Sequence, residues 1–456
     1  MTVNADIARA IEVFKDRSAG YAKTTRYYAG DHDLSFATEK FINAFGKLFH
    51  EFSLNVCKAI CDAVRDKLIV TEFRVEEGGN ESIAKAAWKI WQDNRMGKRS
   101  GEIHKEAVKN GDAYAVVWVD REGKVTIYPN KANTCMVEYD AETPGKILWA
   151  AKYWTTSDKK VRLNLFYPDR IEKFEAKKRQ DRPAGTTAKQ YDKNFTGKTT
   201  DHFVSLPAAK DFVPLDGEPI RNPYGVVPVF HFGNNADMGG CGQSELASAI
   251  PVQDALNKAV LDMLVAMEFA SYRQRWASGI EIEYDDKGKA IPPYVAGIER
   301  LWVSENTDAK FGSFDATDIE QFLKVKDGFR VDMAVVTGTP LYYFMQTGGE
   351  FPSGEALKKA ETRFVNKVKD RMESFGQVWE ELMAFALTIE KQSASGIRLF
   401  TEWEDPSPMS ETDQLNNLIL KQDLGVSDEQ LLIEACLLYT SPSPRDRTRS
   451  RMPSSA

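Results

Sequence analysis

The stretch from Ser353 to Ile389 constrains the fold more than any other part of the chain, because it contains no proline and has the pattern of one long helix. Its apolar side chains recur every three or four residues, at Leu357, Ala360, Phe364, Val368, Met372, Phe375, Trp379, Leu382, Ala386 and Ile389. At a rise of about 1.5 Å per residue, this helix is roughly 50 Å long. The sequence therefore predicts a rod with an apolar stripe along one side.

An aromatic loop precedes this rod. A turn at Thr337–Pro340 leads into the segment Leu341–Pro352, which combines bulky rings with two adjacent glycines. Gly348 and Gly349 allow the backbone of this loop to change shape. A flexible aromatic loop on so long a strut is rare in an enzyme, and it is what an assembly with a central channel needs.

The end of the chain does not resemble natural protein sequence. Cys436–Ser441 back-translates to DNA that looks like the end of a transposon-based sequencing adapter, and Pro442–Asp446 continues it. We therefore expect residues 436–456 to be a translated library artefact and the natural chain to be truncated near Ala435. A genuine Ser/Pro/Arg-rich disordered tail is the alternative, which composition alone also allows.

The charge of the chain limits how it can meet nucleic acid. The 456 residues carry a net charge of −7, and the segment 436–456 contributes +3, so the rest carries −10. This balance argues against a protein that grips DNA or an anionic membrane through bulk positive charge. It is compatible with one past which DNA slides, and the length predicts more than one domain.

Targeting and metal signals are weak. No apolar run is long enough to span a bilayer, and no basic and apolar leader precedes Ile7. The cysteines before residue 436 do not form a zinc pattern and indicate buried free thiols in a reducing compartment: Cys57, Cys61, Cys135 and Cys241. We expect a soluble protein made in the cytosol, with no metal and no cofactor.

The remaining pattern is α+β. Helices are expected over residues 5–28, 56–68 and 83–91, and from about Gly101. Strands then follow at residues 113–119, 124–128, 147–154, 161–167 and 171–174, with another ending at Phe232. A helix is expected at 244–276, with a kink or a fresh start near Pro251, and another at 318–336. Short strands are expected between these two helices, a polar hairpin or loop at 176–200, and short helices after Trp403.

Catalytic chemistry finds little support. The five histidines are scattered, and His32 between Asp31 and Asp33 fits a turn better than a metal or acid–base cluster. The Glu380–Glu381 and Glu402–Asp405 carboxylates fit surface charge better than acid–base pairs. Gly240-Cys-Gly242 before a helix lacks a Walker lysine and a third glycine, so a turn is favoured over a phosphate cradle.

A set of short motifs in fixed order resembles the portal proteins of tailed bacteriophages, of the siphophage type. The motifs are Tyr27–Gly30, Lys109–Ala115, Tyr167–Ile171, Asn222–Pro228, Gly242–Leu246, Gln253–Lys258, Thr339–Leu341 and Ser353–Leu357. Each is weak alone, and together they cover residues 1 to about 435.

The resemblance implies a portal fold with the following regions. Residues 1–240 would form a mixed wing, 241–276 the first stem helix, 277–315 a small clip, 316–340 the second stem helix and 341–352 the tunnel loop. Residues 353–404 would form the long helix and its return to the wing, and 405–435 the start of a truncated helical crown.

The resemblance also implies a role without catalysis. Copies would form a ring, typically of twelve, at one capsid vertex of the virion, as a conduit for DNA packaging, retention and ejection. The clip would dock the terminase and later a head-completion or adaptor protein, and capsid and scaffold proteins would be further partners. The tunnel loop residues that would face the channel are Tyr342, Tyr343, Phe344, Gln346, Thr347, Gly348, Gly349 and Glu350. Whether the rings meet DNA or pack between subunits stays open, and packing is favoured for at least one.

Two other classes remain. One is another structural virion protein, such as a minor head protein, and the other is a hydrolase that uses Glu402 or Glu404. A clip inserted between two stem helices would favour the portal, and loss of activity on mutation of the carboxylates would favour the enzyme.

Overall fold

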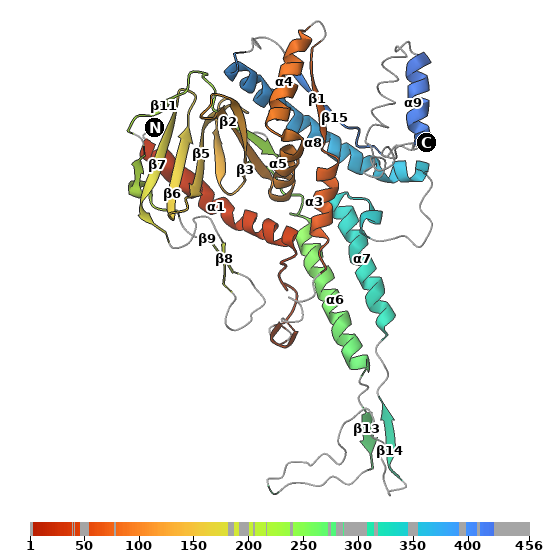
Figure 1. Ribbon diagram of the computed structural model, residues 1–456. Helices are drawn as coiled ribbons and strands as arrows, with labels where there is room; N and C mark the ends of the chain where they lie inside the picture. Colours follow the sequence, from red (N-terminus) through yellow and green to blue (C-terminus); the bar gives the residue numbers. More distant parts are fainter. Residues whose placement is uncertain are drawn as a thin grey trace, which may run out of the picture.

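A computed structural model describes residues 3–38, 40, 42–45, 54–76, 79–180, 187–190, 200–203, 206–215, 217–237, 240–271, 275–279, 286, 308–313, 318–344, 354–391, 398–407 and 411–423. It combines helices and sheets, as expected (Figure 1). The predicted rod is α8 (Gly354–Ile389), which is 36 residues long and confirms the helix within one residue at its start. Its apolar stripe is buried from Phe364 onwards.

A six-stranded antiparallel sheet forms one side of the molecule. Its strands run in the order β10-β7-β6-β5-β4, with β11 also paired to β7. The bounds are β4 (Cys135–Tyr139), β5 (Ile147–Thr155), β6 (Lys160–Phe166), β7 (Arg170–Arg179), β10 (Phe212–Pro214) and β11 (Ile220–Arg221). Helix α1 (Val3–Ala29) crosses one face of this sheet and buries Ile7 and Phe14 against it. Beside it lie the hairpin β8 (Thr187–Gln190) and β9 (Thr200–Phe203) and the short η1 (Ala209–Asp211).

A three-stranded sheet in the order β12-β2-β3 lies at the largest core. Its strands are β2 (Asp112–Val119), β3 (Val125–Lys131) and β12 (Val229–Gly233), and the helices around it are α3 (Cys57–Asp66), α4 (Glu81–Asp93) and α5 (Met96–Asn110). Helix α8 packs against β2 and β12 and inserts Phe375 and Trp379 into this core. A further two-stranded sheet pairs β1 (Val70–Val75) with β15 (Leu399–Trp403) beside α8.

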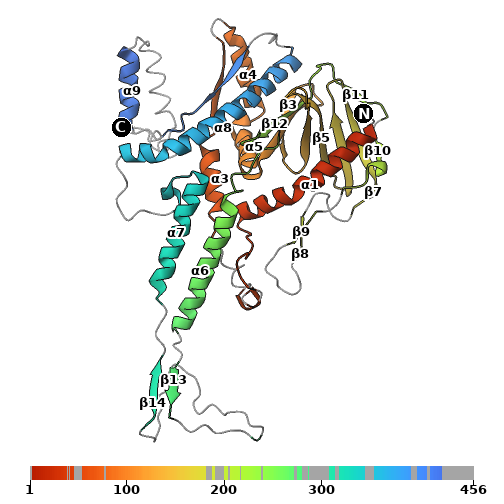
Figure 2. The ribbon, with the colours of Figure 1, turned by 180° about the vertical axis from the view of Figure 1, so that it is seen from behind.

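Two long helices leave this body together. Helix α6 (Ala249–Ser271) and helix α7 (Ile319–Thr337) lie side by side and run in opposite directions (Figures 1 and 2). At their far end β13 (Arg275–Ser278) pairs with β14 (Lys310–Ser313). After α7 comes the short η2 (Leu341–Tyr343), and α9 (Glu411–Asp423) is the last described helix.

The strand and helix predictions differ from the structure in a few places. The helix expected at 244–276 spans Ala249–Ser271, because Ser244 binds the end of α5 and Trp276, in β13, pairs with Gly312 of β14. The fresh start near Pro251 is confirmed, since a proline is tolerated in the first turn of a helix. The helix expected from about Gly101 begins at Met96. The residue before it, Arg95, has a left-handed backbone conformation that separates this helix from α4. The strands expected at 280–284 and 301–303 lie outside the described residues.

Candidate functional site

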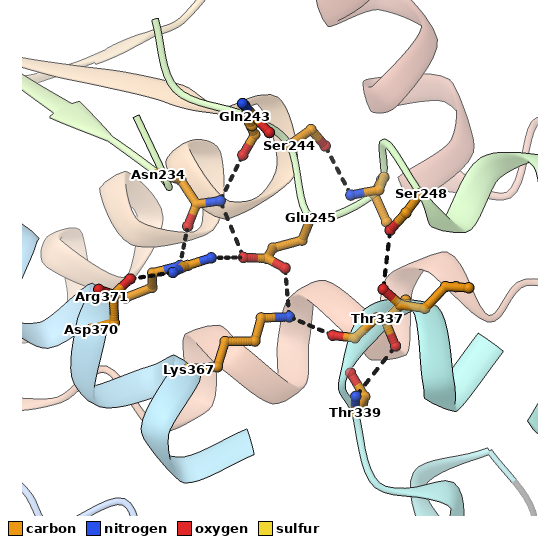
Figure 3. A network of polar contacts seen from close by, with 12 residues as sticks. Asn234, Gln243, Ser244, Glu245, Ser248, Thr337, Thr339, Lys367, Asp370 and Arg371 are labelled. Carbon is orange, nitrogen blue, oxygen red and sulfur yellow. Dashed lines mark hydrogen bonds and ion pairs between the residues drawn. The ribbon is translucent and has the colours of Figure 1, made fainter. Parts of the chain in front are cut away.

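The place where α6, α7 and α8 meet is the best candidate site, because the loop predicted to be functional starts there. Gly338, with φ of +64°, ends α7 in the left-handed conformation that glycine adopts without cost. The last carbonyl groups of α7 are not left unpaired. Lys367 on α8 donates to the Thr337 carbonyl at 2.9 Å, and Ser248 donates to the Val336 carbonyl at 3.4 Å (Figure 3).

A buried ion cluster holds this meeting point together. We call Asn234, Glu245, Lys367 and Arg371 the Glu245 cluster. The Glu245 carboxylate, 8% exposed, lies 2.5 Å from Lys367 Nζ and 2.9 Å from Arg371 Nη2. Asn234, which is fully buried, donates to Glu245 Oε1 at 3.2 Å and accepts from Arg371 Nε at 3.1 Å (Figure 3). Burial alone would raise the pKa of Glu245, but the two cations outweigh it and lower that pKa.

The cluster joins parts of the chain that are far apart in sequence. Glu245 lies just before α6, Asn234 just after β12, and Lys367 and Arg371 one helical turn apart on α8. Lys367 also reaches the end of α7. One carboxylate therefore fixes both long helices to the body of the molecule, and any rotation of the α6–α7 pair would break buried, charge-assisted hydrogen bonds.

A second buried carboxylate anchors the segment that leads into α6. Asp112, at the start of β2, accepts from Tyr21 Oη at 2.5 Å, from His231 Nε2 at 2.7 Å and from the Gly242 amide at 2.7 Å. Since His231 donates through Nε2, its Nδ1 accepts from Tyr139 Oη at 2.8 Å. Burial would raise the pKa of Asp112, but the hydrogen bonds from His231, Tyr21 and the Gly242 amide lower it.

The backbone at this point is packed as closely as glycine permits. Gly111, with φ of +95°, and Gly242 face each other, and a Cβ on Gly111 would lie 2.5 Å from the Gly242 carbonyl oxygen. The Asn234 amide donates to the Gly111 carbonyl at 2.7 Å, and Ser244 Oγ donates to the Lys109 carbonyl at 2.5 Å. Two of the motifs that carry the portal resemblance therefore contact each other in the structure: Lys109–Ala115 and Gly242–Leu246.

Two further pairs of motifs meet in the same way. In α6, Gln253, Asp254 and Asn257 are buried and bind the end of α1 and the residues between α1 and α3. Asp254 accepts from Tyr27 Oη at 2.6 Å, and Gln253 Oε1 accepts from the Val56 amide at 2.9 Å. In the six-stranded sheet, Asn222 donates to the Tyr167 carbonyl at 3.1 Å. The motif residues mostly hold segments together, and the sequence alone did not reveal these pairings.

The residues of the predicted tunnel loop divide between described and undescribed positions. Tyr342, Tyr343 and Phe344 are half-buried; Gln346, Thr347, Gly348, Gly349 and Glu350 lie outside the described residues. Tyr342 donates to Glu361 of α8, and its ring stacks on Tyr343 with centroids 4.9 Å apart. The Tyr343 ring packs against the Phe364 ring, with centroids 5.7 Å apart. Within one chain, these rings fix the start of the loop to α8.

The Glu245 cluster was not predicted from the sequence, although one signal was available. Arg371 falls inside the apolar stripe of the long helix, between Val368 and Phe375, and is 8% exposed. An arginine in a buried stripe needs a buried partner, since unpaired burial of its charge is costly. That partner, Glu245, was present in a named motif, but nothing in the sequence linked the two.

Candidate catalytic groups have structural contacts. His32 donates to the Tyr27 carbonyl through Nε2 and accepts from Asn257 through Nδ1, so both ring nitrogens are occupied. His104 donates to the Leu68 carbonyl and accepts from Trp379 at 3.0 Å, and burial lowers its pKa to about 3. Glu402 pairs with Arg74 at 2.8 Å.

In the part of the chain that the structure describes, no group of three or more His, Cys, Asp or Glu side chains could hold a metal ion. None of the helices in that part has an apolar stretch that would cross a bilayer.

The two buried carboxylates predict an acid-sensitive fold. Asp112 and Glu245 have folded-state pKa values below their unfolded values of about 3.9 and 4.3, so their ionised forms stabilise the native state. That contribution is complete above the unfolded pKa and is lost as pH falls below it. We expect the melting temperature to fall between about pH 5 and pH 3, and Asp112→Asn or Glu245→Gln to flatten this dependence. Glu320→Gln, on an exposed carboxylate, serves as the control. An unchanged slope in both buried variants would contradict the assignment.

Comparison with known proteins gives consistent results. The family model described as phage portal protein, SPP1 Gp6-like, matches residues 8–441. The portal proteins of Mycobacterium phage L5 and Mycobacterium phage D29 are 30% and 29% identical to this chain over 192 residues, which is 40% of this chain. The chain spans 39% of the length of these two curated relatives.

Among solved structures, chains from a gene transfer agent particle are similar to this chain. One comes from the virion of the native particle, at 12% identity and a TM-score of 0.43, and covers 95% of this chain and 94% of its own length. Another comes from the neck of the native particle, computed with C12 symmetry, at 10% identity and a TM-score of 0.45, with 90% of this chain and 97% of its own covered.

Proposed function

The chain belongs to the SPP1 Gp6-like family of phage portal proteins, and we propose that copies of it close into a ring through which double-stranded DNA enters and leaves a capsid. The family is structural, so we propose no catalytic step. One observation carries the ring: α7 exposes five large apolar side chains in 19 residues, Leu323, Val325, Val331, Val335 and Val336. Several exposed apolar side chains on one helix favour a protein interface, and a ring would cover them in every copy.

The charges on the long helices suit a channel that lets DNA pass. Lys258 pairs with Asp262, Lys324 with Glu320 and Arg330 with Asp327, each within one helical turn. Basic groups neutralised in this way offer few strong phosphate contacts, and each such contact would have to break as DNA advances. The net charge of −7 favours the same conclusion.

The regions of the chain would divide the work as follows. Residues 1–240 would be the wing, α6 and α7 the stem, and residues 277–315 the clip at its tip. The tunnel loop would be residues 341–352, with Tyr342, Tyr343 and Phe344 at its fixed end and Gln346, Thr347, Gly348, Gly349 and Glu350 beyond. The long α8 would join that loop to the wing, and residues 405–435 would begin the crown. The Glu245 cluster would then transmit force between stem and wing.

The partners follow from this arrangement. The clip would dock the terminase during packaging and a head-completion or adaptor protein afterwards, while the outer surface would meet capsid and scaffold proteins. We propose a ring of about twelve copies in the virion, assembled in the host cytoplasm.

Charge placed on the α7 face tests the ring. The variant Val331→Asp with Val335→Asp is expected to remain folded but to shift the protein from rings to monomers, because two carboxylates would be buried at each interface. Mass photometry and negative-stain electron microscopy measure the shift, and circular dichroism checks the fold. Val213→Asp, at the outer edge of the six-stranded sheet, is the control and should leave rings intact. Rings of normal abundance in the double variant would rule out α7 as the interface.

A further inference from the structure

We propose that the exposed face of α7 in one copy packs against residues 34–45 of the next copy, with Phe36 as the side chain that inserts. This inference rests on the proposed ring and specifies which two surfaces meet in it. It concerns the described residues 34–38, 40 and 42–45, which we call the 34–45 segment.

The spatial order of the elements places these two surfaces on opposite flanks. The 34–45 segment lies beside α6 on the side away from α7 in both views (Figures 1 and 2). Leu34 and Ile42 of the segment bury against Leu261 of α6. The α7-facing side of α6 is different, because there Leu256 and Val260 share a core with Met333 of α7. The order across the molecule is therefore segment, α6, α7 and the exposed face of α7.

A ring of identical subunits needs such opposite flanks. Its contacts are heterologous, so that one surface of each copy meets a different surface of the next. The outward face of α7 therefore needs an apolar counterpart on the other flank of the α6–α7 pair. The 34–45 segment supplies one there.

Phe36 is held where it can serve as that counterpart. The neighbouring Ser35 donates to Asp254 of α6 at 2.7 Å, and Leu34 is buried, so the segment is fixed at this point. Phe36 is nevertheless 60% exposed, as is Val335 on the other flank. A bulky ring held out by a fixed backbone loses little conformational freedom on insertion, which favours binding.

The charges beside the two surfaces are complementary. Lys40 is exposed on the 34–45 segment, and Asp332 is exposed on α7 between Val331 and Val335. Among the described residues, neither has an ion-pair partner within its own chain. Opposite charges at the rim of an interface favour correct pairing and add little affinity. The Lys40 and Asp332 charges thus favour the arrangement in which the 34–45 segment of one copy faces α7 of the next.

Crosslinking between copies tests the contact. The background chain carries Cys241→Ser and Cys436→Ser, so that these two thiols cannot react with the crosslinker. Cys57, Cys61 and Cys135 are kept, because they are buried. Phe36→Cys and Val335→Cys are then combined, rings are collected, and a short bis-maleimide crosslinker is added. We expect a ladder of covalent oligomers on a denaturing gel. The control pair Phe36→Cys with Lys85→Cys, whose second site is exposed on α4, should yield monomers.

The outcomes separate this inference from the ring itself. Rings in the electron microscope without a ladder would overturn the contact and leave the proposed function standing. Monomers from the background chain would overturn both. If Val335→Cys alone prevents rings, Val331→Cys replaces it, and a ladder from that pair supports the contact while its absence from intact rings refutes it.

Discussion

A Gly242→Ala chain is expected to lose more than about 4 kcal/mol of stability and to be recovered mostly as insoluble protein. The added Cβ would overlap the Gly111 carbonyl oxygen and lie 2.7 Å from the Asn234 amide nitrogen. Those atoms are backbone and are hydrogen-bonded to each other, so they cannot move aside as a flexible side chain could. Losses of this size are exceptional and arise when core backbone is forced apart.

Two other glycines provide the matched control for this substitution. Gly20 in α1 and Gly328 in α7 lie inside helices, and a Cβ at either would meet no atom within 4 Å. Gly20→Ala and Gly328→Ala are expected to raise stability by up to about 1 kcal/mol, because alanine favours the helix. Melting temperatures by circular dichroism and soluble yield measure all three variants. If the Gly242→Ala protein had the melting temperature of the wild type, the backbone segments around Gly111 and Gly242 could move apart without cost, and this prediction would be wrong.

Glu245→Ala is expected to cost about 3–5 kcal/mol, because it leaves Lys367 and Arg371 buried without a counter-charge. The loss should be local as well as global. Since Lys367 also binds the end of α7, amide hydrogen exchange in the last turn of α7 should accelerate more than in the six-stranded sheet.

A control and a rescue sharpen this second prediction. Asp370→Ala removes the other carboxylate beside Arg371, but its side chain is 67% exposed, so the change should be small. The triple variant Glu245→Leu, Lys367→Met and Arg371→Met replaces the ions by apolar groups of similar size and should recover most of the stability. A Glu245→Ala protein as stable as Asp370→Ala would contradict the role of the cluster.

The long helix was predictable because its signal is local. From Ser353 to Ile389 the apolar stripe, the absence of proline and the helical spacing all agree, and α8 matches the prediction. The strands at 113–119 and 147–154 were equally clear, since β-branched and aromatic residues dominate them. The break at Arg95 was not predictable, because a left-handed arginine between two helices has no sequence signature.

Pairing between distant segments was beyond reach of the sequence. Strand β1 pairs with β15, although more than 300 residues separate Val70 from Trp403. The burial of β1 follows no strict alternation, so no periodic signal marked it. The ion cluster was hidden for the same reason, since Glu245 and Arg371 belong to different motifs and meet only when the chain is folded.

The proposed ring is tested most directly by a reconstruction of the purified assembly by electron cryomicroscopy. We expect a closed ring in which α7 of each copy contacts the next and Tyr343 lies at the wall of a central channel. A population of single, compact chains, or a ring whose channel is remote from Tyr343, would contradict it.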